Sequence, residues 1–196
     1  MNKTSKVNCF KKEISYVKDS SLKKDLKVLI GLLPDYFFEV PASSTGKYHP
    51  DFALGDGGLV RHTKVAVRFA YELLSNDTVG CKFMDHDKDL IIMALILHDG
   101  LKSGLEHNKY TKFDHPLLIS KYIMENKEKL AMDVDDLRKV CSMIESHMGQ
   151  WTYDSYKKKD VLPKPRTAEQ RFVHMCDYLA SRKFININFK GNDVQD

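Results

Sequence analysis

Histidine and aspartate side chains recur along this chain at positions from which imidazole and carboxylate groups can meet in space. Each lies near the start or the end of a segment with helical periodicity, and the set is His62, His98, Asp99, His115, His147 and Asp177. Successive antiparallel helices bring the start of one helix beside the end of the next. Imidazoles and carboxylates that converge in this way are typical ligands of a divalent metal ion, and such an ion indicates hydrolytic chemistry.

The helices expected to carry His62 and His98 place the two side chains at a similar depth. Residues 57–74 put apolar side chains on one helical face, with His62 near the start. Residues 88–99 form a strongly apolar segment that ends before Gly100, a residue typical of helix ends. At about 1.5 Å per residue, the chain after His62 and the chain before His98 run for roughly 18 and 15 Å, so antiparallel packing aligns the two imidazoles.

The same arrangement recurs further along the chain. His115 opens the helical segment 114–125, and His147 ends the helical segment 134–148. Asp177 lies within the last expected helix, which also carries apolar side chains on one face. The ligand types therefore accompany successive helix ends, as a site between packed helices requires.

Two long loops separate the expected helices. Residues 34–58 contain three prolines and four glycines and predict an irregular loop that leads into the His62 helix. A loop of that length in a compact domain is more often functional than not. Residues 151–166 form the second loop, after which Thr167 and Gln170 predict a capping box at the start of the last helix. The tail 183–189 alternates in part and could add a short extended segment.

Length and composition favour one globular all-α domain over residues 1–196. Within it we expect N-terminal helices and a loop over residues 1–56, and a metal-binding core over residues 57–183. One or two amphipathic helices are expected over residues 8–31, interrupted near residues 19–21. The hydrophobic content of 42% and the charged content of 30% indicate a globular rather than a disordered chain.

The sequence predicts a cytoplasmic protein with no membrane partner. No run approaches the roughly 18 apolar residues that span a bilayer, and residues 1–13 lack the apolar core of a signal peptide. The four cysteines form no CxxC pair, so reduced thiols are expected. The net charge of +4 permits an anionic substrate without demonstrating a nucleic-acid partner.

Neutral imidazoles and carboxylates suit Mn, Fe, Co, Ni or Zn, with Mg also open, and the donor set selects none of them uniquely. Asp99 has two carboxylate oxygens, so it could bind one ion and bridge to another. In that arrangement the first ion is held by His62, His98, Asp99 and Asp177, and the second by His115 and His147. Whether one or two ions bind is left open.

Asp99 and Lys102 are the candidate catalytic residues. A water that bridges two such cations loses a proton near neutral pH and becomes a strong nucleophile, able to attack phosphorus in line with the leaving oxygen. Lys102 lies one helical turn beyond the His98-Asp99 pair and could place a cation on a phosphoryl oxygen as charge develops. An ordinary solvated lysine is the alternative.

This pattern resembles the H…HD…D signature of HD-domain metal-dependent phosphohydrolases, over roughly residues 57–183. Residues 58–63 (GLVRHT) resemble the GLxxHT entry motif of that superfamily, and residues 98–102 (HDGLK) resemble its HDxxK form rather than its HDxxE form. The resemblance implies an HD-domain helical bundle, divalent metal ions, and hydrolysis of a phosphodiester or nucleotide phosphoester.

Residues 146–177 look like the end of the HD domain in bacterial 3′→5′ exoribonucleases that carry an added OB-fold. Those relatives often have His-His-Gly where this chain has His147-Met148-Gly149, which leaves the second ion one ligand fewer. The N-terminal 56 residues are too few for the OB-fold and read as helical. Stand-alone HD proteins of this kind occur in phage and bacterial genomes, so the resemblance implies a bacterial or phage-encoded protein.

Cationic and aromatic residues that flank the ligand set are candidates for substrate binding. Lys47 and His49, in the loop before the site, could contact a phosphate or a base. Arg61, Lys64 and Arg166 could form a cationic rim. Trp151 follows His147 closely and could stack on a nucleobase. Loop packing, ordinary surface charge and an apolar contact under a loop are the alternatives.

The leading hypothesis is a metal-dependent phosphodiesterase that acts on a nucleotide or a short oligonucleotide. A mononuclear nucleotidase that releases phosphate from nucleoside mono- or triphosphates is the first alternative, and a non-catalytic nucleotide-binding HD module is the second. Specificity would come from the loops 34–58, 100–114 and 150–166, whose shapes the sequence does not reveal. The oligomeric state, a homo-oligomer included, is open.

Overall fold

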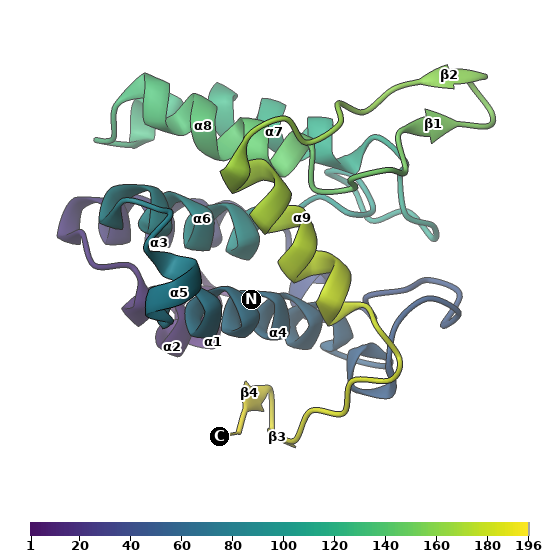
Figure 1. Ribbon diagram of the computed structural model, residues 1–196. Coiled ribbons are helices and arrows are strands. Elements are labelled where there is room, and N and C mark those ends of the chain that lie inside the picture. The colour runs from purple at the N-terminus through teal and green to yellow at the C-terminus, as the bar shows by residue number, and fades with distance from the viewer. Residues whose placement is uncertain (196) are drawn as a thin grey trace.

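The computed structural model describes residues 1–195 and consists mainly of packed helices, which confirms the all-α class (Figure 1). The chain begins with α1 (Lys3–Cys9), α2 (Lys11–Tyr16) and α3 (Ser20–Leu32). The Asp19 carboxylate caps α3, because it accepts hydrogen bonds from the first backbone N–H groups of that helix. The break expected near residues 19–21 is therefore confirmed, and its cause is an N-cap.

The helices of the core follow the expected order. They are α4 (Gly58–Ser75), α6 (Asp85–Leu97), α7 (His115–Glu125), α8 (Val134–Glu145) and α9 (Ala168–Ala180). The predicted ends differ from these by up to three residues. The largest differences lie at the start of α6 and the end of α8, because the chain after α8 continues as tight turns that still resemble a helix in sequence.

Short elements fill the segments between the main helices. They are α5 (Asp77–Gly80), the 3-10 helices η1 (Asp35–Phe38), η2 (Asp51–Ala53) and η3 (Lys127–Lys129), and the strands β1 (Tyr153–Asp154), β2 (Lys159–Asp160), β3 (Phe189–Lys190) and β4 (Asp193–Val194). β1 pairs antiparallel with β2, and β3 pairs antiparallel with β4. The extended segment expected near residues 183–189 is thus a hairpin that starts at the end of that range.

The apolar helix α6 lies at the centre of the bundle. It packs against α4, α8 and α9, and Figure 1 shows it between α4 on one side and α7 with α8 on the other. Every residue from Leu90 to Leu97 is buried. A helix surrounded on all sides needs apolar side chains on all sides, which is why its sequence lacks a polar face. Burying each leucine or isoleucine of α6 contributes about 1.5–3 kcal/mol.

The predicted capping box at the start of α9 is present. The Thr167 hydroxyl accepts a hydrogen bond from the Gln170 backbone N–H, and the Gln170 side-chain oxygen accepts one from the Thr167 N–H. This fixes where α9 begins, and hence where Asp177 falls along it. Among residues 1–195, no helix combines the length and the apolar character needed to cross a membrane.

Candidate metal centre

The six expected ligands converge at one end of the bundle, and five of them are positioned by helix ends. His62 lies in the second turn of α4, and His98 immediately follows α6. His115 is the first residue of α7, and His147 lies in the turn after α8. Asp177 comes from the C-terminal half of α9, which packs across α4 and α6. All four of these histidines are buried.

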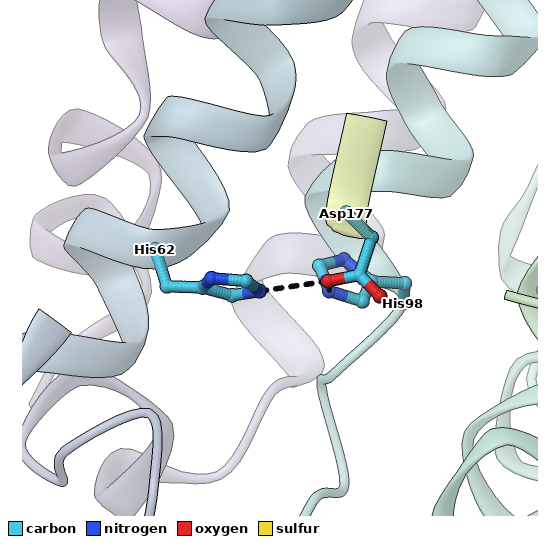
Figure 2. A group of neighbouring side chains, drawn as sticks. All are labelled: His62, His98 and Asp177. Carbon is cyan, nitrogen blue, oxygen red and sulfur yellow. Dashed lines mark hydrogen bonds and ion pairs between the residues drawn. The ribbon is translucent and has the colours of Figure 1, made fainter. Parts of the chain in front are cut away.

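One group of ligands lies between α4, α6 and α9. Figure 2 shows His62 and Asp177 pointing toward each other, with His98 beside them. The His62 Nε2 atom lies 2.9 Å from Asp177 Oδ1, and His98 Nε2 lies 3.4 Å from the same oxygen. Ligand atoms about 2.1 Å from a shared ion are separated by roughly 3.0–3.4 Å in octahedral and tetrahedral sites. The spacing therefore suits a single shared cation.

A second group of candidate ligands surrounds Asp99, whose two carboxylate oxygens face different imidazoles. Asp99 Oδ2 lies 3.4 Å from His98 Nε2 and 4.0 Å from His62 Nε2, whereas Asp99 Oδ1 lies 3.0 Å from His115 Nε2 and 3.8 Å from His147 Nε2. The two Nε2 atoms of His115 and His147 are 3.4 Å apart. Each carboxylate oxygen thus faces a different pair of imidazoles, which is the orientation a bridging ligand needs.

Three of the histidines are held in one tautomer by backbone carbonyls. In each of them Nδ1 donates a hydrogen bond to the carbonyl oxygen three residues earlier, at 2.6–2.7 Å, and the pairs are His98 with Leu95, His115 with Lys112, and His147 with Ile144. A ring nitrogen fixed in this way leaves Nε2 free to bind a cation. For His98 and His147, the acceptors are carbonyls in the last turns of α6 and α8.

The Nε2 atom of His98 gives a direct test of whether a cation fits. It is buried and has no hydrogen-bond partner among residues 1–195. Buried polar atoms without partners are costly and rare in folded proteins. A divalent cation between His98, Asp99 and Asp177 would satisfy this nitrogen and would neutralise the carboxylates of the buried Asp99 and the partly exposed Asp177. The donor set therefore fits a divalent metal ion.

The electrostatics of the centre favour positive charge. Burial alone lowers the pKa of a histidine, but the Asp99 and Asp177 carboxylates outweigh burial at His98 and raise its pKa to about 10. Burial works against ionisation of these two carboxylates as well. The charges of Lys102 and His98 beside Asp99, and the hydrogen bonds from His62 and His98 to Asp177, nevertheless hold the pKa values of both carboxyls well below the usual range. Burial, together with the charge of His98, lowers the pKa of His147 to about 3, so this imidazole stays neutral.

Lys102 lies beside the ligands. Its Nζ donates a hydrogen bond to Asp99 Oδ2 at 2.5 Å, and its side chain is 12% exposed. Both residues line a cavity of about 680 Å³ that also contains His115, His147 and Asp177. The lysine thus places its charge at the cavity wall instead of extending into solvent.

The residues expected to bind substrate divide into two groups. His49 and Trp151 line the cavity, and the ring of His49 lies 4.8 Å from that of His62. Burial lowers the pKa of His49 to about 2. Lys47 is exposed on the same loop as His49. Arg166 is exposed just before α9 and is absent from the cavity lining.

The prediction that Arg61 forms part of a cationic rim at the site is wrong. Its guanidinium donates hydrogen bonds to the carbonyl oxygens of Phe52, Leu54 and Asp56, so it holds together the loop before α4. These contacts hold the Arg61 side chain away from the cavity, whose lining does not include it.

The prediction that Lys64 forms part of this cationic rim is wrong as well. This lysine is 2% exposed, and its Nζ contacts Asp193 Oδ1 at 2.5 Å and Glu13 Oε2 at 3.7 Å. Lys64 is about 200° from His62 around α4 and therefore lies on the opposite face. It joins α2, α4 and the C-terminal hairpin instead of the metal centre.

The cavity lining includes residues that were not predicted from sequence, among them Tyr178 and Arg182. Tyr178 lies among apolar residues of the last helix, and its residue type alone does not distinguish it from them. A usable signal was its position next to Asp177, since adjacent helical residues can both reach the same cavity. Arg182 follows Tyr178 by four residues, which places the two side chains on the same face.

Comparison with known proteins agrees with this geometry. A protein-family model of the HD domain matches residues 59–182, which include all six expected ligands. The chain belongs to the HD-domain superfamily of metal-dependent phosphohydrolases. A search of curated proteins and a search of solved structures found no match to this chain. The finer resemblance to exoribonucleases therefore rests on the sequence pattern alone.

Proposed function

We propose that this protein is a metal-dependent phosphodiesterase that cleaves a nucleotide or a short oligonucleotide. The single observation that carries the proposal is the orientation of Asp99, whose two oxygens face two separate sets of imidazoles. Metal pairs that share a bridging carboxylate are common in enzymes that hydrolyse phosphate esters. A divalent metal bound here would acidify a coordinated water and offset negative charge on phosphoryl oxygens.

The protein's own residues would orient the substrate. Lys102 holds its ammonium group at the cavity wall beside Asp99, where it can stabilise charge that develops on a phosphoryl oxygen. His49 and Trp151 line the same cavity and would contact the remainder of a nucleotide. The nucleotide assignment is supported by this mixture of cationic and aromatic groups, which suits phosphate and base together.

The alternatives differ in the number of ions or in turnover. A mononuclear nucleotidase needs only the ligands around His98 and Asp177, and it leaves the contacts of His115 and His147 with Asp99 without a role. A non-catalytic module has no need of a complete ligand set. The complete core set of His62, His98, Asp99 and Asp177 therefore disfavours the module, and the contacts of His115 and His147 with Asp99 favour the two-ion diesterase.

The test combines turnover with metal counting. Hydrolysis of bis-p-nitrophenyl phosphate is measured with Mn, Co, Ni, Zn or Mg for the wild type, H98A and D99A, and bound ions are counted by elemental analysis. H86A is the control, because His86 is exposed and pairs with Asp136 outside the cavity.

We expect turnover by the wild type and H86A, loss of turnover in H98A and D99A, and two ions per wild-type chain. One ion per chain with release of phosphate from nucleotides would support the nucleotidase. Equal activity in all four proteins would overturn the catalytic assignment.

A further inference from the structure

One wall of the cavity carries a stack of two aromatic rings and a guanidinium group. The rings of Trp151 and Tyr178 lie 5.9 Å apart at an interplanar angle of 20°. The Arg182 guanidinium lies over the Tyr178 ring, 4.0 Å from its centroid. All three residues line the cavity that contains Asp99 and Asp177. The stack therefore faces the same space as the metal centre.

The charge of Arg182 is not balanced by an acid. Its guanidinium donates hydrogen bonds to the Tyr178 carbonyl and the Ser181 hydroxyl, at 3.1 and 2.7 Å. Within residues 1–195, no carboxylate lies within ion-pair distance of this guanidinium. By contrast, Lys102 in the same cavity is paired with Asp99. A guanidinium has five N–H donors, so Arg182 keeps hydrogen-bonding capacity for an anion.

The C-terminal half of α9 fixes the stack relative to the metal centre. Tyr178 directly follows the ligand Asp177, and Arg182 lies one turn beyond Tyr178, just after the helix ends. One turn corresponds to roughly 5–6 Å along the axis. A substrate phosphate at the metal ligands and a second anionic group at Arg182 would thus be separated by about the size of one nucleotide unit.

We propose that Trp151, Tyr178 and Arg182 form a subsite that binds a nucleobase and a second phosphate group of the substrate. The inference rests on the proposed function, since the metal centre takes the phosphate that is cleaved. Aromatic rings bind bases of any sequence by stacking, and a planar guanidinium binds a phosphate through paired hydrogen bonds. The cavity of about 680 Å³ has room for both. The substrate class is a nucleotide that carries two phosphate groups, such as a dinucleotide with a terminal phosphate.

Trp151 allows the subsite to be tested without catalysis, because it is the only tryptophan in the chain. Its fluorescence is titrated with adenosine 3′,5′-bisphosphate and, separately, with adenosine 5′-monophosphate. Neither probe contains a phosphodiester to be cleaved. We expect saturable fluorescence changes with both, and binding of the bisphosphate on the order of tenfold tighter, as a charge-assisted contact implies.

The variant R182Q is expected to lose the preference for the bisphosphate. R171Q is the matched control, because Arg171 is exposed on the same helix and does not line the cavity. R182K, which keeps the charge but not the planar fork, is expected to retain part of the preference. This variant also keeps a donor near the Tyr178 carbonyl, so it tests the subsite even if R182Q folds poorly.

The outcome does not depend on turnover. An equal preference for the bisphosphate in the wild type, R182Q and R182K would overturn the subsite. Trp151 fluorescence that does not change with either probe would also overturn it. If the wild type cleaves no phosphodiester with any metal but the preference is present and depends on Arg182, the proposed function fails and the subsite stands.

Discussion

At the scale of single residues, Asp99 connects the two halves of the metal centre and also holds Lys102. Its carboxylate contacts His98 and Lys102 through Oδ2 and His115 through Oδ1. The candidate metal ligands His98 and His115 and the candidate catalytic residue Lys102 are thereby all held against the same carboxylate. This arrangement makes the contribution of Lys102 measurable, because Lys102 is not among the expected metal ligands.

The variant K102M is expected to lower kcat on bis-p-nitrophenyl phosphate by roughly 100-fold while the bound metal stays at its wild-type amount. The reason is that one positively charged donor to the developing phosphoryl charge is lost. K121M on the exposed face of α7 is the control, since Lys121 is 75% exposed. A rise in KM with unchanged kcat would show that Lys102 binds the ground state and the transition state equally and does not accelerate the chemical step.

The residue types of the ligand set were predictable from sequence, whereas the directions of their neighbours were not. His62, His98 and Asp177 were identified by spacing alone, and the structure brings them together. Arg61 and Lys64 were assigned to the same site because they are close to His62 in sequence. Residues that are close in sequence on a helix can direct their side chains differently. Residues two positions apart are separated by about 200° around the helix axis and so lie on opposite faces.

At the scale of elements, the turn after α8 positions His147. Gly149 adopts a left-handed backbone conformation with φ +63°, and an added Cβ would meet the His174 ring at 2.1 Å. The His174 Nδ1 donates a hydrogen bond to the His147 carbonyl at 2.7 Å. Thus His174 packs against the turn that carries a ligand. The glycine of this chain's His-Met-Gly is explained by that close approach.

The variant G149A is expected to lower the free energy of unfolding by about 2–4 kcal/mol, through backbone strain and the clash with His174. G191A is the matched control, because Gly191 has φ +61° but an added Cβ there meets no atom within 4 Å. Its cost should be limited to about 1–2 kcal/mol of backbone strain. Urea unfolding measures both, and equal losses would show that His174 moves aside freely.

A second junction between elements is the buried contact of Glu13 on α2 with Lys64 on α4. Burial raises the pKa of the Glu13 carboxyl above 4.5 despite the attraction of Lys64. When pH rises from 4.5, the unfolded chain loses its Glu13 proton first, so the folded state loses stability until pH exceeds the folded pKa. At higher pH, the ionised and buried Glu13 therefore costs stability relative to a neutral side chain.

The variant E13Q is expected to gain stability relative to the wild type as pH rises from 4 to 7, because its neutral amide avoids the cost of ionising a buried carboxyl. Urea unfolding at the two pH values measures this gain, with E125Q on the exposed part of α7 as control. By contrast, K64M leaves Glu13 without its buried partner and should cost about 3 kcal/mol or more at pH 7. If E13Q instead lost stability relative to the wild type, and lost more as pH rises, the raised pKa of Glu13 would be contradicted.

The elements themselves were predictable in proportion to their length. The long periodic segments predicted the first residues of α4 and α7 to within one position, and the capping box predicted where α9 begins. The two hairpins have strands of only two residues, which show no alternation that a sequence can reveal. The aromatic and guanidinium stack was missed for a related reason, because it depends on how the loop at Trp151 folds back onto α9.

At the scale of the whole molecule, the metal centre brings together helices that are far apart in sequence. Its ligands come from α4, from the turn after α6, from α7, from the turn after α8 and from α9, around the buried α6. A cation there binds the folded state only, since the unfolded chain cannot assemble the set. Binding and folding are therefore thermodynamically linked.

Removing metal is accordingly expected to lower the melting temperature of the whole protein in one transition. An ion present at 100 times its Kd adds about 2.7 kcal/mol, which corresponds to roughly 5–10 °C for a chain of this size. Calorimetry of the chelator-treated protein with and without Mn, Co, Ni, Zn or Mg measures the shift, at constant ionic strength so that general screening is excluded. H86A should show the wild-type shift and D99A should lose it, because Asp99 contacts ligands of both groups. An equal shift in D99A would place the stabilising ion elsewhere on the molecule.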